Sequence, residues 1–120
     1  MKPIISETGF GYIIVDGSKI KNDIVIRLSG KVKKRKKKLS KAVYGTSHTL
    51  SLDEAKDVYK KGAEKLIIGS GQDGQVGLSE EAAGYFKKKN CEVILEPTPE
   101  ALKKWNKAEG SVIGLFHVTC

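Results

Sequence analysis

Helix and strand signals alternate along the chain from about residue 50, and this alternation restricts the fold more than any other feature. Three segments carry helix signals and begin with a residue that can cap a helix: residues 51–62, 79–90 and 98–110. Three short apolar segments of strand character alternate with them: residues 65–68, 92–95 and 111–118. Alternation of this kind predicts a largely parallel sheet with right-handed crossover connections.

The first 30 residues indicate strands and tight turns instead of helices. Residues 12–15 are β-prone, Asp16-Gly17 is a hairpin turn signal, and residues 19–21 can pair back across the turn. A further apolar segment at residues 24–28 ends at a Ser-Gly turn. The sequence therefore predicts a single α/β domain over residues 1–120, with an N-terminal β-hairpin, a mostly parallel sheet and about three helices.

A glycine-rich loop follows the apolar segment 65–68 and spells G-S-G-Q-D-G at residues 69–74. This matches G-x-G-x-x-G, the dinucleotide-binding signature, in which the helix begins directly after the third glycine and its amides meet the pyrophosphate. Here residues 75–78 separate the loop from the helix cap at Ser79. We therefore interpret the loop as an irregular one that needs glycine for its backbone angles, and we expect no cofactor.

Polar loops are expected to meet at one edge of the sheet, because the carboxyl ends of parallel strands lie together there. The loop 45–48 joins this edge if residues 42–44 form a strand, and residues 119–120 join it if the last strand is parallel. Helix N-termini nearby would favour an anion. The candidate ligand-pocket residues are Ser47, His48, Gly69, Ser70, Gly71, Gln72, Thr98, His117 and Cys120.

The residues that carry reactive groups do not form a recognisable catalytic or metal-binding motif. Ser47 and His48 are adjacent in sequence, which does not make a nucleophile–base pair, and no acid that would orient the histidine is apparent. His117 lies in an apolar strand, which is typical of a hydrogen-bonded core imidazole. No residues match zinc or two-metal spacing, so we expect no metal and no enzymatic activity. The alternative is a catalytic site that uses His48 or Cys120.

Most of the net charge of +8 comes from one short segment, residues 31–41. Its basic residues are Lys31, Lys33, Lys34, Arg35, Lys36, Lys37, Lys38 and Lys41. The remaining 14 basic residues equal the 14 acidic ones in number. We interpret the segment as a solvated edge strand or loop, whose lysine charges oppose aggregation through the sheet edge. The alternative is sequence-independent nucleic-acid binding, although the segment has no aromatic residue to stack on bases.

Cysteine content and hydropathy indicate a cytoplasmic protein with no membrane association. The two cysteines, Cys91 and Cys120, are too few for a disulfide framework, which fits a reducing compartment. The N-terminus lacks the apolar core of a signal peptide, and no apolar segment is long enough to span a bilayer.

An ordered set of short motifs extends over nearly the full length. The motifs are F-G-Y at 10–12, D-G at 16–17, Y-G-T-S-H at 44–48, L-I-I-G-S-G at 66–71, P-T-P-E-A at 97–101, W-N at 105–106 and F-H-V-T-C at 116–120. The set resembles the small family that includes the mitochondrial complex I assembly factor three and the adipogenesis-associated domain protein. Its archaeal and bacterial members are stand-alone domains of unknown function.

The resemblance implies a compact three-layer α/β domain with a mixed sheet and no established activity, cofactor or metal. The mitochondrial member implies a role in protein binding or assembly. Two departures from the family pattern are the dense lysine segment and Trp105, which stands where tyrosine or phenylalanine is common. We therefore expect a non-catalytic binding or assembly module with a protein partner. A small anion at the sheet edge and nucleic acid at residues 31–41 remain the alternatives, and the oligomeric state is open.

Overall fold

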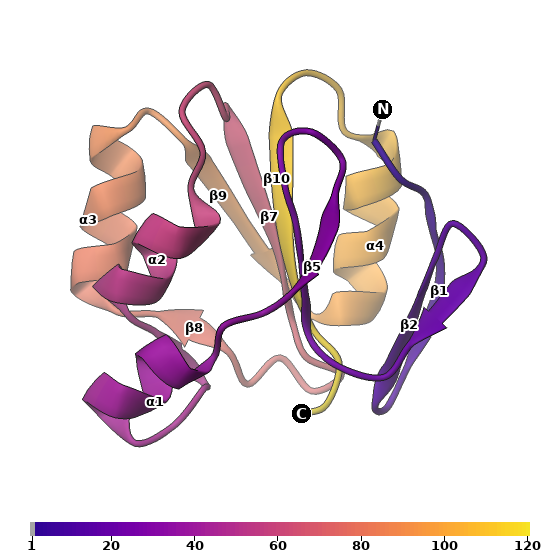
Figure 1. The fold of residues 1–120 in the computed structure, drawn as a ribbon, viewed down its shortest axis with the longest axis horizontal. Helices are drawn as coiled ribbons and strands as arrows, with labels where there is room; N and C mark the ends of the chain where they lie inside the picture. The colour runs from indigo at the N-terminus through magenta and orange to yellow at the C-terminus, as the bar shows by residue number, and fades with distance from the viewer. Residues whose placement is uncertain (1) are drawn as a thin grey trace.

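The computed structural model describes residues 2–120 and has an α/β fold (Figure 1). The strands are β1 (Ile5–Gly9), β2 (Tyr12–Val15), β3 (Ser18–Ile20), β4 (Ile24–Ile26), β5 (Val32–Lys34), β6 (Thr49–Leu50), β7 (Lys65–Ser70), β8 (Gly77–Leu78), β9 (Glu92–Glu96) and β10 (Val112–His117). The helices are α1 (Lys38–Tyr44), α2 (Leu52–Val58), α3 (Glu80–Lys88) and α4 (Thr98–Lys107). None of the helices in residues 2–120 has the length and apolar character needed to cross a membrane.

A five-stranded mixed sheet in the order β5-β4-β10-β7-β9 forms the centre of the fold. Strands β10, β7 and β9 run parallel, whereas β4 is antiparallel to β10 and β5 is antiparallel to β4. All six residues of β10 are buried, because the strand lies in the middle of the sheet and both of its faces are covered. The predicted mixed, mostly parallel sheet is therefore confirmed, and β4 is the one strand of the five that runs in the opposite direction.

Two layers cover the central sheet, which gives the three-layer arrangement that the family resemblance implied (Figure 1). Helices α2 and α3 lie on one face, where Phe86 belongs to a core cluster that includes Leu66 and Ile68. Helix α4 and the β1-β2-β3 sheet lie on the other face, where Trp105 and Ile67 share the second cluster. Successive residues of β7 thus enter opposite cores, as the period of a strand requires.

Two of the three predicted helix caps are confirmed. Ser51 Oγ accepts a hydrogen bond from Glu54 N at 3.2 Å, and Ser79 Oγ accepts one from Ala82 N at 3.1 Å. The predicted cap at Thr98 is wrong, because Thr98 is already helical and the residue before the helix is Pro97. Thr98 is fully buried, and its hydroxyl donates to the carbonyl of His117 at 2.6 Å instead.

Residues 42–44 do not form the strand on which the placement of the loop 45–48 was made conditional, because they are the last turn of α1. The helix ends at Gly45, whose N–H donates to the carbonyl of Lys41 at 2.9 Å. The sequence did not predict this helix, because its first turn has no acidic residue and no capping side chain and its lysines suggested a solvated loop. Strand β1 was missed as well: it pairs with β2, and Ile5 enters the core although most of its neighbours are exposed.

Gly114 allows the aromatic side chains of α4 and β10 to pack against the sheet. A Cβ at Gly114 would lie 2.6 Å from Phe116 Cε2 and 3.0 Å from Trp105 Cζ3. The two rings meet edge to face with centroids 5.8 Å apart, so neither has room to withdraw.

Substitution of Gly114 by alanine should therefore lower the free energy of unfolding by about 1–3 kcal/mol through overpacking. Gly84→Ala is the matched control, because Gly84 lies on the exposed side of α3 with nothing within 4 Å of an added Cβ. The control should gain about 0.5–1 kcal/mol from helix propensity. Chemical denaturation measures both values, and equal effects at the two glycines would contradict this packing account.

Candidate functional site

The structure brings the predicted polar loops together at the carboxyl edge of β7, β9 and β10. Gly71 N donates to Thr98 Oγ1 at 2.9 Å, and Gln72 N donates to the carbonyl of Thr119 at 2.7 Å. The loop 45–48 also reaches this edge, although residues 42–44 are helical: His48 Nε2 lies 3.4 Å from Cys120 Sγ. We call this region the polar edge.

The glycine loop of the polar edge is filled by the protein's own chain. Gly71 has φ +105°, and a Cβ there would lie 2.3 Å from the carbonyl carbon of Cys120. The main-chain oxygen of Cys120 accepts hydrogen bonds from Asp73 N at 3.2 Å and Gln75 N at 3.1 Å. These amides are therefore unavailable to a pyrophosphate, which supports the interpretation of residues 69–74 as a structural loop. They also give no support to the alternative of a small anion in the loop.

The remaining predicted pocket residues at this edge serve as packing and backbone groups. Gly69 lies against Thr98 and Phe116, where an added Cβ would be 2.8 Å from each side chain. Ser70 is buried, and its carbonyl accepts from Val76 N at 2.9 Å. Ser47 is buried, and its carbonyl accepts from Arg35 Nη2 at 2.7 Å. Within residues 2–120 neither serine hydroxyl is hydrogen-bonded to an imidazole, so no serine–histidine nucleophile pair is formed.

Arg35 leaves the solvated lysine segment and enters the protein interior, which corrects its assignment to the basic patch. Its side chain is completely buried and makes a two-pronged contact with Glu54, through Nε to Oε2 at 2.6 Å and Nη2 to Oε1 at 3.1 Å. Nη1 lies 3.0 Å from Asp23 Oδ2. Burial opposes the charge of Arg35, but the hydrogen bond and charge of Glu54, and then Asp23, raise the pKa of the guanidinium overall.

Sequence reasoning missed Asp23 and assigned Glu54 only to a helix cap. The one signal in the sequence is that Arg35 is the single arginine in a run of lysines. Arginine presents a planar set of donors that suits buried carboxylates, whereas lysine presents a compact, strongly hydrated charge. Every buried side-chain nitrogen and oxygen in residues 2–120 has a hydrogen-bond partner, so this network is complete.

Asp23 connects the buried ion network to His117. His117 Nδ1 donates to Asp23 Oδ2 at 2.7 Å, and Val118 N donates to Asp23 Oδ1 at 2.9 Å. Burial by itself would raise the pKa of Asp23, but these hydrogen bonds and the charges of His117 and Arg35 lower it overall. Asp23 therefore stays ionised and holds the His117 ring in one orientation.

Three side chains with metal-ligating atoms converge beside this network; the sequence predicted their place at the polar edge but no metal site. His48, His117 and Cys120 each place one such atom within 4.8 Å of the other two. His117 is buried, whereas His48 and Cys120 are partly exposed. No metal-ligand spacing in the sequence marks this group, because the fold brings the loop 45–48 against the end of β10 and the ligand atoms come from distant segments.

The lysines of the segment 31–41 remain at the surface, as predicted. Strand β5 is the edge strand of the central sheet, and six of the segment's seven lysines are exposed while Lys37 is partly exposed: Lys31, Lys33, Lys34, Lys36, Lys37, Lys38 and Lys41. The neighbouring ammonium group of Lys31, followed by the charges of Arg27 and Lys36, lowers the pKa of Lys33. The direction of this change indicates positive charge that nearby acids do not neutralise.

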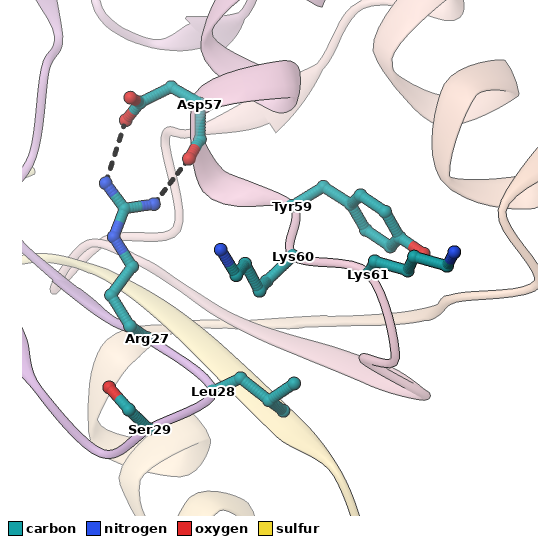
Figure 2. Close-up of a pocket in the computed structure, with 7 residues that line it drawn as sticks. All are labelled: Arg27, Leu28, Ser29, Asp57, Tyr59, Lys60 and Lys61. Atoms are coloured by element: carbon teal, nitrogen blue, oxygen red, sulfur yellow. Dashed lines mark hydrogen bonds and ion pairs between the residues drawn. The ribbon is translucent and has the colours of Figure 1, made fainter.

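A pocket of about 720 Å³ lies at the opposite edge of the sheet from the polar edge, and Lys36 of this segment contacts one of its lining residues, Asp57. Its lining residues, drawn in Figure 2, are Arg27, Leu28, Ser29, Asp57, Tyr59, Lys60 and Lys61. Arg27 donates to the carbonyl of Asp57 and also lies 3.4 Å from its carboxylate, which Lys36 contacts from the other side at 3.4 Å. Two cationic side chains therefore share one carboxylate, and the further lining residues Lys60 and Lys61 leave the pocket positively charged.

The ion network predicts that substitution of Arg35 lowers the free energy of unfolding far more than substitution of an adjacent lysine. Arg35→Met should lower the free energy of unfolding by about 3–5 kcal/mol, because Glu54 and Asp23 would remain buried without their partner. Lys34→Met, one residue away but exposed, should change it by no more than about 0.5 kcal/mol. Chemical denaturation of the two variants tests this, and similar values would show that Arg35 is not structural.

The two cysteines should differ in reactivity toward a thiol reagent. Burial raises the pKa of the Cys91 thiol to about 11, so near pH 8 only about one thiol in a thousand is a thiolate. In the folded protein a disulfide reagent should therefore modify Cys120 and leave Cys91 intact, and both should react in denaturant. Peptide mapping of the modified chain measures this, and rapid modification of Cys91 in the folded state would contradict it.

Comparison with known proteins agrees with the fold and the motif set. Residues 5–116 match the family described as "Protein of unknown function (DUF498/DUF598)". The chain is similar to the structure of the conserved hypothetical protein PH1505 from Pyrococcus horikoshii OT3, with 35% identity, a TM-score of 0.91 and coverage of 100% of both chains. It is also similar to the structure titled MT938, with 31% identity, a TM-score of 0.83 and coverage of 99% of this chain and 100% of that chain.

A more distant structure shares the fold alone. A Bordetella pertussis protein described as a Mth938-like domain has 15% identity and a TM-score of 0.63, with coverage of 97% of this chain and 85% of that chain. The resemblance inferred from the ordered motifs, to the family that includes the mitochondrial complex I assembly factor three, is thus confirmed. The chain belongs to the DUF498/DUF598 family of Mth938-like domains, whose function is unknown.

Proposed function

We propose that the protein is a non-catalytic binding module that holds an acidic protein segment on its basic face. The basic face consists of Arg27, Lys31, Lys33, Lys36, Lys60 and Lys61. The observation that carries the proposal is the 720 Å³ pocket beside Asp57, where cationic side chains surround an apolar surface. This is the binding role expected from the sequence, with the chemistry of the partner added.

The pocket combines charge with a place for an apolar side chain. Leu28 and Tyr59 are partly exposed and supply the apolar lining, while Lys60 extends toward Arg27 and Lys61 lies beside the Tyr59 ring (Figure 2). A peptide that carries carboxylates on both sides of one apolar residue would satisfy both features. Such anchoring by a single side chain in a pocket is a common basis of peptide recognition.

The environment of the Tyr59 ring favours a protein partner over nucleic acid. Sequence-independent binding of single strands uses aromatic faces on which bases stack. The Tyr59 ring is engaged by Tyr85, with ring centroids 5.8 Å apart at 89°, and by Lys89 Nζ at 5.9 Å from its centroid. The ring is therefore held by neighbours within the protein and is a poor stacking platform.

A charge-reversal pair tests the basic face directly. Lys60→Glu combined with Lys61→Glu should weaken binding of a short synthetic peptide, glutamates around a central leucine, by about 10-fold or more. Lys103→Glu combined with Lys107→Glu makes the same change in net charge on exposed positions of α4 and should weaken it by no more than about 2-fold. Fluorescence anisotropy at fixed ionic strength measures both affinities.

Two outcomes would overturn the proposal. Equal weakening by the two variants would mean that net charge alone attracts the peptide, without a docking surface. Tighter binding of a single-stranded oligonucleotide of equal charge than of the peptide, lost in the Lys60/Lys61 variant, would make the basic face a nucleic-acid site instead.

A further inference from the structure

We propose that His48, His117 and Cys120 form a metal site, and that zinc is the ion that fits it best. One potential ligand atom from each of the three residues lies within 4.8 Å of the other two. His48 Nε2 and Cys120 Sγ are 3.4 Å apart, and nitrogen and sulfur ligands of a tetrahedral zinc ion are separated by about 3.5 Å. A small inward adjustment of His117 would complete three of the four positions.

The three ligands come from chain segments that hydrogen bonds already hold in place. His48 N donates to Thr46 Oγ1 at 3.1 Å, and the carbonyl of His48 accepts from Gly77 N at 2.8 Å. Cys120 is held by the amides of Asp73 and Gln75 at its carbonyl oxygen. A site assembled on fixed backbone needs little ordering when it binds an ion, which favours affinity.

His117 has the environment of a metal-binding histidine. Its Nδ1 donates to Asp23 at 2.7 Å, so the lone pair that an ion could use is on Nε2. A carboxylate that orients a histidine in this way is the usual outer partner of zinc ligands. Thr119 Oγ1 lies 3.1 Å from Nε2 and donates to it, so the hydroxyl would turn away when the ion binds.

Charge and ligand chemistry favour a borderline-soft cation. A cation on His117 would lie across the ring from the Asp23 carboxylate, whose negative charge would stabilise it. Imidazole and thiolate ligands favour zinc or copper over magnesium and calcium. Partial exposure of His48 and Cys120 gives an ion a path from solvent and leaves the fourth position to water.

Cobalt(II) provides a spectroscopic test on the full 120-residue chain under reducing conditions. We expect one cobalt ion per chain, with a thiolate-to-cobalt charge-transfer band and the visible bands of tetrahedral coordination. Cys120→Ser should abolish the charge-transfer band, whereas Cys91→Ala, which changes the other cysteine, should retain it. His48→Gln should weaken cobalt binding by about 10-fold or more, because even an outer partner of a ligand contributes about 10–100-fold.

Zinc and thermal unfolding supply a second readout that separates binding from folding. Zinc should raise the Tm of the parent chain and of Cys91→Ala but not that of Cys120→Ser. The metal-free Cys120→Ser variant should unfold at the same temperature as the metal-free parent, since Cys120 is partly exposed. Absence of cobalt and zinc binding at micromolar concentrations would overturn the proposal, and so would binding that Cys120→Ser leaves unchanged.

Discussion

The buried guanidinium of Arg35 is the interaction on which this end of the molecule depends. It joins the segment after β5 to Glu54 of α2, to Asp23 before β4 and to the backbone at Ser47. Such a network does not exceed a well-packed apolar core in stability, because taking the charges out of water offsets much of their attraction. The network instead fixes positions. With Arg35 buried, Asp23 and Glu54 can both hydrogen-bond the guanidinium in only one arrangement, and this holds α2 and the segment before β4 in place.

The polar edge is not an open ligand cleft, because the protein's own chain fills it. In many open α/β sheets the carboxyl ends of the parallel strands leave backbone amides free for a bound anion. Here Thr98 and Cys120 occupy the space above Gly69 and Gly71, and the loop amides bind the protein's own carbonyl and hydroxyl oxygens. The reactive side chains at this edge are His48, His117 and Cys120, and the same network orients His117 through Asp23. The basic face lies at the other edge of the sheet and is independent of it.

The elements with strong local signals could be predicted from the sequence, and those without them could not. Serine caps marked the starts of α2 and α3, because the capping hydrogen bond joins residues three apart. Helix α1 lacks a capping side chain, and its lysine-rich sequence resembled a solvated loop. At Thr98 the local signal for a helix cap was misleading, because the Thr98 hydroxyl donates a hydrogen bond to the carbonyl of His117 in β10 instead of capping α4. Convergence at the polar edge was foreseeable, since it follows from strand direction, but the partners that fill it were not.

The sequence by itself determined the α/β class, the order of most helices and strands, the solvated lysines and the family, since each of these rests on periodicity, on neighbours within a few residues or on an ordered set of motifs. Only the tertiary structure decided which residue of the basic segment is buried and which reactive side chains meet. The contacts between Arg35 and Glu54, and between His48 and Cys120, join residues 19 and 72 positions apart. Side-chain contacts at such separations arise from the packing of whole helices and strands, and a local sequence pattern cannot predict them.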